Sequence, residues 1–440
     1  MASLAIVFVL ALSARLIYFL IFIYTQHDIC IGDPFCGSEL GQVASNLYYG
    51  RGFSSPFESG NLPTAYFAPL VPVLWSAIFH LVGDTSKLSY VVIVLLQIIA
   101  SSLSVCVYWL CARQVESKSP LRFQGFTHWA GVMFILWPES ILRNIDPWYF
   151  VWQELGLAVL VYLGMLWIDS PRRHLGVLLG LAAGIIGNIN PTPFPVYLAI
   201  LAVPLLQRSY RTRQVLGGIA LSLVVAVICL APWTIRNYRA FDQVILGRSN
   251  FGLQLWLGNN PTGAIRMDKN ALHPYIDKQE LKRYNQMGEV TYFQQAAHQA
   301  VEYIRQHPTI TSIRFLQRAY VLWLTDITDQ WSWFPNREAA KWWKASGNNL
   351  ILSLTTMLSA VLPLVVVLYG LARRKLAGLP YWQIFLSIFI FMPLTYYFTL
   401  ANPVYTQSVR TWLAFLAVLV LVQINRRTIP NAPKPLIKLL

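Results

Sequence analysis

Charge is scarce in this chain, and acidic side chains are the scarcest. Only 12% of its 440 residues are charged, and 34 Lys and Arg stand against 19 Asp and Glu. An average soluble domain carries about a quarter charged residues. Hydrophobic residues make up 56% of the sequence, so the composition excludes an ordinary soluble enzyme and indicates a membrane protein.

Cysteine and the short motifs of soluble enzymes are also scarce. The chain has no P-loop, dinucleotide-binding, zinc-protease or serine-hydrolase motif. Among its five Cys, three lie in apolar runs and act as small apolar residues. The other two, Cys30 and Cys36, share one polar loop, where they either pair in an oxidising compartment or stay free.

The same loop contains His27, Asp28 and Asp33, which together with its two Cys resemble metal ligands only loosely. Their spacing matches no zinc pattern. We therefore expect no metal site and no cofactor, while the question of a divalent metal stays open.

Apolar runs near the length of a bilayer span, about 20 residues, recur along the chain. We expect ten to twelve crossings. The clear runs are 4–24, 90–111, 148–168, 215–233, 350–371, 382–400 and 409–424, and the weaker ones are 65–82, 127–142, 175–189 and 193–206. The first run contains Arg15 and is followed by no A-x-A-like site, so we expect it to stay in the protein.

The net charge of +15 is concentrated in short linkers and the tail. These are 113–122, 172–173, 208–213, 373–375 and 426–438. Such clustering is typical of cytoplasmic loops and not of a nucleic-acid site. It places five other connections outside, namely 25–65, 142–147, 187–193, 237–346 and 402–407.

One part of this topology is inconsistent. Residues 65–111 must cross an odd number of times, yet they contain two apolar runs. Either the run 65–82, which Pro69 and Pro72 interrupt, is re-entrant, or 112–126 lies outside despite its charge.

The loop 25–65 combines acidic side chains with a short amphipathic helix. In Leu40, Val43, Ala44 and Leu47 the apolar positions recur with helical spacing, so one face suits a membrane surface. Glu39 begins this helix, where the helix N-terminus stabilises a carboxylate. Acids held there in a polytopic protein suggest chemistry on a lipid-borne substrate.

Several ordered motifs resemble one family. The loop pattern consists of Phe35, Gly37, Glu39, Gly41, Ala44, Leu47, Gly50, Gly52 and Phe53, followed by Pro63, Thr64 and Ala65. Later segments are A-P-W-T-I-R-N-Y at 231–238, R-S-N-F-G at 248–252, L-G-N-N-P at 257–261, and G-L-A-A-G at 180–184 with Asn-Pro at 190–191. Over about two-thirds of the chain they resemble bacterial GT-C glycosyltransferases. That superfamily includes the dolichyl-phosphate-mannose protein mannosyltransferases and the lipid A aminoarabinose transferases.

The resemblance implies a fold and a reaction. It implies an all-α, GT-C-like bundle in the bacterial inner (plasma) membrane, with an active site facing the periplasm. The implied partner is a polyprenyl-phosphate sugar donor, and the implied reaction is inverting transfer to a protein, lipid or glycan acceptor.

The sequence departs from the family pattern at the expected position of the catalytic base. Many relatives carry D-x-x-E-Y, but here Cys36 stands at the Asp position and Leu40 at the Tyr position. The general base is therefore either Glu39 or Asp33.

The leaving phosphate needs cationic side chains. Arg236 is the first choice, because it ends a span beside Trp233 at the expected outer interface. The motifs and outer turns add weaker substrate-binding candidates, which are Arg143, Asp146, Asn237, Arg248, Asn259 and Arg410. Arg15, Glu139 and Glu154 lie within apolar runs, where each is either functional or paired with another such residue.

The expected organisation has four parts. Residues 1–236 form the transmembrane module with the loop 25–65. Residues 237–346 form a small external helical cap that ends in a Trp-rich interfacial stretch at 331–343. Residues 347–425 return to the membrane, and 426–440 form a basic cytoplasmic tail. Two alternatives stay open, a lipid or sugar transporter or flippase and a non-catalytic accessory subunit.

Overall fold

The fold is built from α-helices. The computed structural model describes residues 4–25, 38–206, 212–263, 272–324 and 350–425, and within these ranges there is no strand. Five helices there are long and apolar enough to cross a membrane. They are α1 (Leu4–Thr25), α4 (Lys87–Lys118), α8 (Phe150–Asp169), α11 (Thr212–Phe241) and α20 (Gln407–Asn425). The expected class, an all-α integral membrane protein, is confirmed.

Four shorter apolar helices accompany the long ones in the described residues, namely α3 (Leu70–Val82), α9 (Arg173–Gly187), α10 (Phe194–Ala202) and α19 (Trp382–Phe398). A further apolar helix, α18 (Leu350–Ala372), packs against α20. The run 127–142 forms α6 (Phe126–Ile135) and α7 (Pro138–Leu142), because Pro138 cannot continue the helix. The count of ten to twelve crossings stays a prediction.

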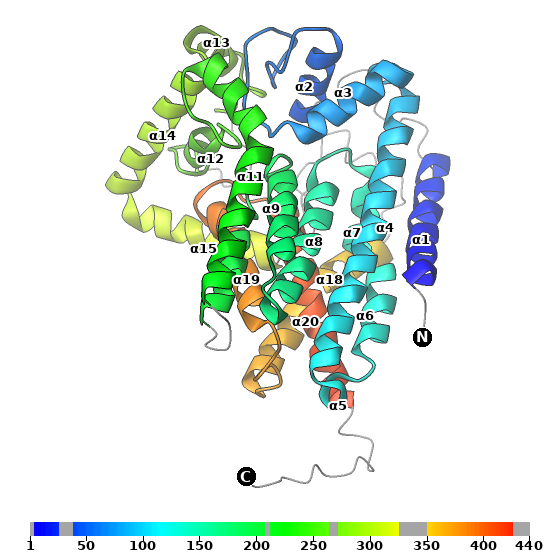
Figure 1. The fold of residues 1–440 in the computed structure, drawn as a ribbon. Helices are drawn as coiled ribbons and strands as arrows, with labels where there is room; N and C mark the ends of the chain where they lie inside the picture. The colour runs from blue at the N-terminus through cyan, green and yellow to red at the C-terminus, as the bar shows by residue number, and fades with distance from the viewer. Residues whose placement is uncertain (1–3, 26–37, 207–211, 264–271, 325–349, 426–440) are drawn as a thin grey trace.

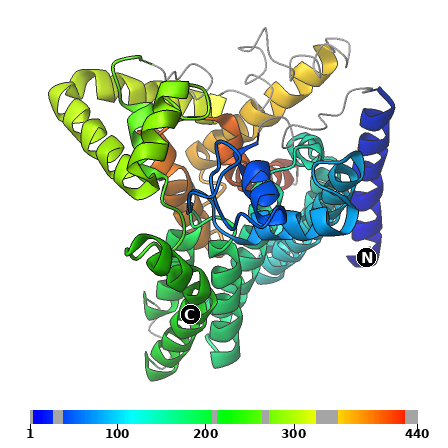
Figure 2. The same ribbon diagram turned by 90° about the horizontal axis from the view of Figure 1, so that it is seen from above.

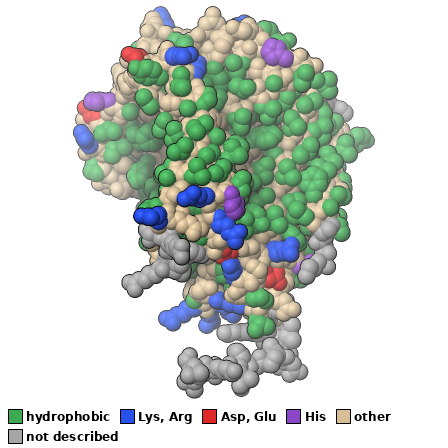
Figure 3. All heavy atoms as spheres, viewed as in Figure 1, with side chains coloured by type: hydrophobic (Ala, Val, Ile, Leu, Met, Phe, Trp, Pro, Cys, Tyr) green, Lys and Arg blue, Asp and Glu red, His purple; other side chains and the backbone are tan. Residues whose placement is uncertain are grey.

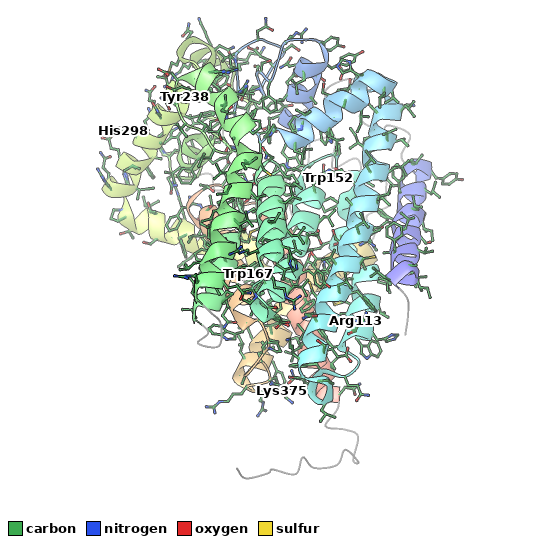
Figure 4. All side chains as sticks on the ribbon, viewed as in Figure 1. Arg113, Trp152, Trp167, Tyr238, His298 and Lys375 are labelled. Carbon is green, nitrogen blue, oxygen red and sulfur yellow. The ribbon has the colours of Figure 1, made fainter. Side chains whose placement is uncertain are left out.

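The bundle has two chemically different ends (Figure 1). The linkers rich in Lys and Arg that fall within the described residues lie at the lower end in this view, and Arg113 and Lys375 mark it in Figure 4. Lys and Arg side chains gather there below a broad hydrophobic area (Figure 3). The described residues of the first loop and of the segment after α11 lie at the opposite end. We call these the basic end and the loop end, and they separate as the charge pattern predicts.

The inconsistency at 65–126 is resolved by α3. This helix lies at the loop end beside α2 (Glu39–Tyr48), and α4 then runs from the loop end to the basic end (Figure 1). The amide of Leu70 is fixed there by the carbonyl of Asn188, at 2.9 Å. The apolar run 65–82 therefore returns on the side from which it came, which is the first of the two alternatives.

Close packing of α9 against α11 depends on small residues. A Cβ atom on Gly180 would come within 2.2 Å of the Ser222 carbonyl oxygen, and one on Gly176 would meet the Gly218 carbonyl at 2.4 Å. Small residues that allow two backbones to approach in this way are typical of helix pairs in membranes.

The described part of the segment 237–346 contains four helices after the end of α11, joined by turns. Its helices are α12 (Phe251–Gly258), α13 (Lys278–Met287), α14 (Glu289–Gln306) and α15 (Pro308–Leu324). The side chain of Asp277 caps α13 by accepting hydrogen bonds from the amides of Gln279 and Glu280. Seen from above, the first-loop residues lie between α3 and this group of helices (Figure 2). The predicted Trp-rich stretch 331–343 lies outside the described residues.

Candidate functional site

The first loop delivers Glu39 into the protein on α2. Ser38 caps this helix, because its hydroxyl accepts a hydrogen bond from the Gly41 amide at 3.0 Å. The apolar face was expected to lie on the membrane surface, and that expectation is wrong. Leu40, Val43 and Ala44 are buried in a core cluster that includes residues of α3. Burial of this face holds the helix in one orientation and leaves Glu39 itself 7% exposed.

A cavity of about 350 Å³ opens beside Glu39 at the loop end. The first loop, two turns between spans, the segment before α12 and the end of α19 all contribute to its wall. The polar side chains that line it are Glu39, Asn190, Thr192, Arg248, Asn250, Gln254, Thr395 and Thr399, and the aromatic ones are Tyr66, Phe67, Trp148, Tyr149, Phe251, Phe391, Tyr396 and Tyr405. Small-molecule sites measure about 300–1,000 Å³, so the cavity has room for one small polar group.

Arg248 supplies the cationic side of the cavity. Its Nε donates to the carbonyl of Tyr66 at 2.9 Å, and its Nη1 donates to the hydroxyl of Tyr149 at 3.3 Å. The guanidinium also lies over the rings of Phe67 and Tyr149, 4.8 and 5.4 Å from their centroids. Aromatic faces stabilise a cation at this distance. The side chain is therefore held in place beside the cavity before any ligand enters.

Tyr66 lies on the cavity wall as a neutral phenol. Burial raises its pKa well above the ordinary value, the negative charge of Glu39 raises it further, and Arg248 opposes both. His273 Nδ1 accepts from the Tyr275 amide at 3.1 Å, so its Nε2 carries the hydrogen and donates to Tyr66 Oη at 3.4 Å. Gln254 Nε2 also donates to Tyr66 Oη at 3.2 Å. The phenolic oxygen of Tyr66 thus accepts hydrogen bonds from two side chains.

The buried His273 predicts acid sensitivity at the loop end. Burial lowers its pKa from 6.5 to about 3, so its contribution to stability is complete above pH 6.5 and decreases as the pH falls toward 3. At about pH 5 the loss should be about 2 kcal/mol. We expect thermal unfolding in detergent to show this loss relative to about pH 7.5. His273→Gln should remove that part of the pH dependence, and an unchanged pH dependence in this variant would contradict the assignment.

Arg236, the first choice for the phosphate, does not line the cavity. Its Nη1 donates to the carbonyl of Thr64 at 2.7 Å, and its Nη2 donates to the carbonyl of Phe53 at 2.5 Å. The neighbouring Asn237 accepts from Arg236 at 3.0 Å and donates to the carbonyl of Ile245 at 3.0 Å. Arg236 thus holds the backbone of the first loop, Asn237 binds the segment after α11, and neither residue lines the cavity.

The remaining substrate-binding candidates other than Arg248 also lie away from the cavity wall. Arg143 forms an ion pair with Asp146 at 2.9 Å. Arg410 forms a buried ion pair with Glu139 at 3.0 Å. Asn259 donates to the carbonyls of Leu255 and Phe398, at 2.9 and 2.7 Å. Of the seven predicted substrate-binding residues, the cavity includes only Arg248.

The other charges within apolar runs are satisfied inside the bundle. Arg15 donates to Ser101 at 2.7 Å and to backbone carbonyls of α1 and α6. Glu154 accepts from the hydroxyls of Tyr108 and Ser140, at 3.2 and 3.1 Å, and from the Gln407 amide at 3.0 Å. Their surroundings are those of structural polar contacts between helices.

Asp33, Cys30 and Cys36 lie outside the described residues, so the choice between Asp33 and Glu39 stays a prediction. Within the described part of the chain no group of three or more His, Cys, Asp or Glu side chains is arranged to hold a metal ion. The candidate ligands of the first loop belong to the part that is not described.

Most of the cavity wall was not predicted. Tyr66 directly follows the recognised Pro63, Thr64 and Ala65, and Asn250 lies inside R-S-N-F-G, but no role was assigned to either residue. Tyr149, Gln254, Tyr396 and Tyr405 come from segments with no distinguishing pattern. For Tyr66 and Asn250, the only signal in the sequence was a position inside or directly beside a recognised motif.

Fold and site together define an all-α integral membrane protein with a charged, aromatic-lined cavity at one end. No protein-family model and no curated protein sequence matches this chain. Two solved structures of ArnT from Cupriavidus metallidurans are similar to it, one in the apo state and one bound to undecaprenyl phosphate. Each ArnT chain is 14% identical in sequence to this chain. The aligned region covers 95% of this chain and 77% of the ArnT chain, with TM-scores of 0.39 for the apo structure and 0.40 for the bound structure.

Proposed function

We propose that this protein is a membrane glycosyltransferase that moves a sugar from a polyprenyl-phosphate donor to an acceptor at the loop end. The observation that carries the proposal is one cavity lined by both Glu39 and Arg248. Transfer from a lipid phosphate needs a carboxylate for the acceptor proton and a cation for the leaving group. The sequence resemblance to GT-C glycosyltransferases supports the same reaction class.

Glu39 is the proposed general base. It is the first residue of α2, where the helix N-terminus favours the ionised carboxylate. The acceptor oxygen or nitrogen attacks the anomeric carbon and forms the new bond, while its proton passes to Glu39. The bond from the anomeric carbon to the phosphate oxygen breaks, and its electron pair stays on the phosphate. Attack from the face opposite the phosphate inverts the anomeric configuration.

Arg248 is the proposed phosphate-binding residue, in place of Arg236. Its guanidinium is fixed by the Tyr66 carbonyl and two aromatic rings and lies on the cavity wall. A charge that is already oriented stabilises a developing phosphate anion with little reorganisation. The tyrosines and amide side chains around it suit the hydroxyl groups of one sugar ring, because a few placed polar groups on an aromatic wall orient a small ligand.

The orientation of the loop end is a separate prediction. The positive linkers should face the cytoplasm. In a variant without native Cys, Glu302→Cys on exposed α14 should react with a membrane-impermeant thiol reagent on intact cells. Arg373→Cys at the exposed basic end should react only after the membrane is opened. The reverse labelling pattern would overturn the orientation.

Sugar transfer itself tests the function. The purified full-length protein is incubated with polyprenyl-phosphate donors carrying labelled sugars, together with protein, lipid and glycan fractions as acceptors. The expected result is movement of label to one acceptor class with release of polyprenyl phosphate. A folded protein that releases none from any donor would contradict the proposal.

A further inference from the structure

Glu289 is a buried acid that the proposed reaction does not use. It is the first residue of α14 and follows Gly288, whose φ of 76° turns the chain sharply between α13 and α14. The Glu289 side chain is almost completely buried, at 2% exposed. A carboxylate at the start of a helix is stabilised by the helix dipole, but its burial still requires hydrogen-bond donors.

Both oxygens of Glu289 are engaged. Oε1 accepts from the Ala65 amide at 2.6 Å and from the Ser249 hydroxyl at 2.6 Å. Oε2 accepts from the Thr64 hydroxyl and, at 2.9 Å, from the Tyr284 hydroxyl. Burial raises the pKa of Glu289, and these four groups oppose the rise by donating to the charged form. One side chain thus joins the first loop, the segment before α12 and the end of α13.

The first loop is held from the opposite direction by Arg236. Glu289 binds the Ala65 amide, and Arg236 binds the Thr64 carbonyl at 2.7 Å. This N–H and this C=O belong to one peptide group, and in a trans peptide they point in opposite directions. An anion and a cation therefore fix the orientation of a single peptide plane.

Two cavity residues, one in the first loop and one in the segment before α12, are chain neighbours of residues that Glu289 binds. Tyr66 is next to Ala65, and Arg248 is next to Ser249. The two segments also bond to each other, through the Ser249 amide to the Ala65 carbonyl at 2.9 Å and through Arg248 Nε to the Tyr66 carbonyl at 2.9 Å. Each of these two cavity side chains therefore lies one residue away from a group that Glu289 binds.

We infer that Glu289 is a positioning residue that sets Tyr66 and Arg248 in the cavity from α14. Its neutral form cannot replace its charged form, because a protonated acid or an amide has fewer acceptor sites for four donors. The inference rests on the proposed function for the identity of the ligand, and on the contacts of Glu289 for the positioning itself.

Two measurements on the full-length protein test the inference. Hydrogen exchange by mass spectrometry reports the amides of 64–67 and 247–250, and undecaprenyl phosphate serves as the binding probe. In Glu289→Gln we expect exchange at these amides to rise roughly ten-fold, because their anchor is weakened. We also expect affinity for the probe to fall roughly ten-fold, because Arg248 is no longer fixed.

Glu280→Gln is the matched control. Glu280 is an acid of the same segment, but it binds Tyr292 at 2.7 Å and Arg283 at 2.8 Å and makes no side-chain hydrogen bond to the first-loop residues that the structure describes. This variant should leave both measurements unchanged. If Glu289→Gln does not fold, Ser249→Ala removes one donor of the cluster and should raise exchange at 247–250 by a smaller factor.

The outcomes separate the two proposals. A lower melting temperature in Glu289→Gln with unchanged exchange at these amides and unchanged probe affinity would show a merely structural role and overturn the inference. Wild-type protein that binds no undecaprenyl phosphate would count against the proposed function, and the exchange result would still decide whether Glu289 positions the two segments.

Discussion

Replacing Glu39 with Gln should lower the rate of sugar transfer by a factor of about 10² to 10⁴, the usual contribution of a general base. The amide keeps the shape of the side chain and much of its hydrogen bonding but cannot take a proton. Folding should be preserved, because the core of the first loop is formed by Leu40, Val43 and Ala44. Initial rates at saturating donor, with melting temperature measured in parallel, provide the test.

Asp33→Asn is the control for this prediction, because Asp33 is the rival base. It should retain most of the activity. If Asp33→Asn abolishes transfer and Glu39→Gln does not, the base is Asp33. If neither change affects the rate, the acids of the first loop are structural and the proposed mechanism loses its base.

Arg248→Ala should weaken donor binding by about 1.5–3 kcal/mol, a factor of roughly 10 to 150, because a charged hydrogen bond to the phosphate is lost. The effect should depend on the charge and its position together, so Arg248→Lys should recover part of the affinity without the planar fork of the guanidinium. Binding of undecaprenyl phosphate to the purified protein measures both variants.

Arg236→Ala is the comparison that separates the two arginines. Because Arg236 holds the carbonyls of Phe53 and Thr64, this change should lower the melting temperature more than Arg248→Ala does. If Arg236→Ala lost donor affinity at an unchanged melting temperature, while Arg248→Ala kept its donor affinity, the phosphate-binding residue would be Arg236.

The fold class could be predicted because it depends on local properties of the sequence. Length and hydropathy of the runs at 4–24 and 90–111 identify helices α1 and α4, and the clusters of Lys and Arg identify the basic end. The path of 65–82 could not be predicted. Its composition suits a span, and tertiary contacts keep α3 at the loop end, among them its packing against α2 and the hydrogen bond of Leu70 to Asn188.

The site was predicted in part, because it is assembled from distant segments. The start of α2 and the R-S-N-F-G motif marked Glu39 and Arg248 in the sequence. From the sequence, Arg236 was preferred to Arg248 as the phosphate-binding residue because it lies at the end of an apolar run. Arg236 is kept away from the cavity wall by its hydrogen bonds to the carbonyls of Thr64 and Phe53, which precede it by 172 and 183 positions in the sequence. Periodicity and local motifs contain no information about such contacts.

The amphipathic helix shows the same limit. Its apolar face correctly predicts α2, but the pattern does not distinguish a lipid surface from a protein surface. Burial against α3 was decided by tertiary packing, with Val43 and Ala44 completely enclosed. Glu289 was missed for a related reason, since its four donors come from three separate segments.

The most direct measurement is an experimental structure of the protein with a bound polyprenyl phosphate. The predicted result is phosphate density in the cavity within hydrogen-bond distance of Arg248, with Glu39 facing the same space from the acceptor side. Phosphate density at Arg236 or at another surface, with the cavity between Glu39 and Arg248 empty, would contradict the account.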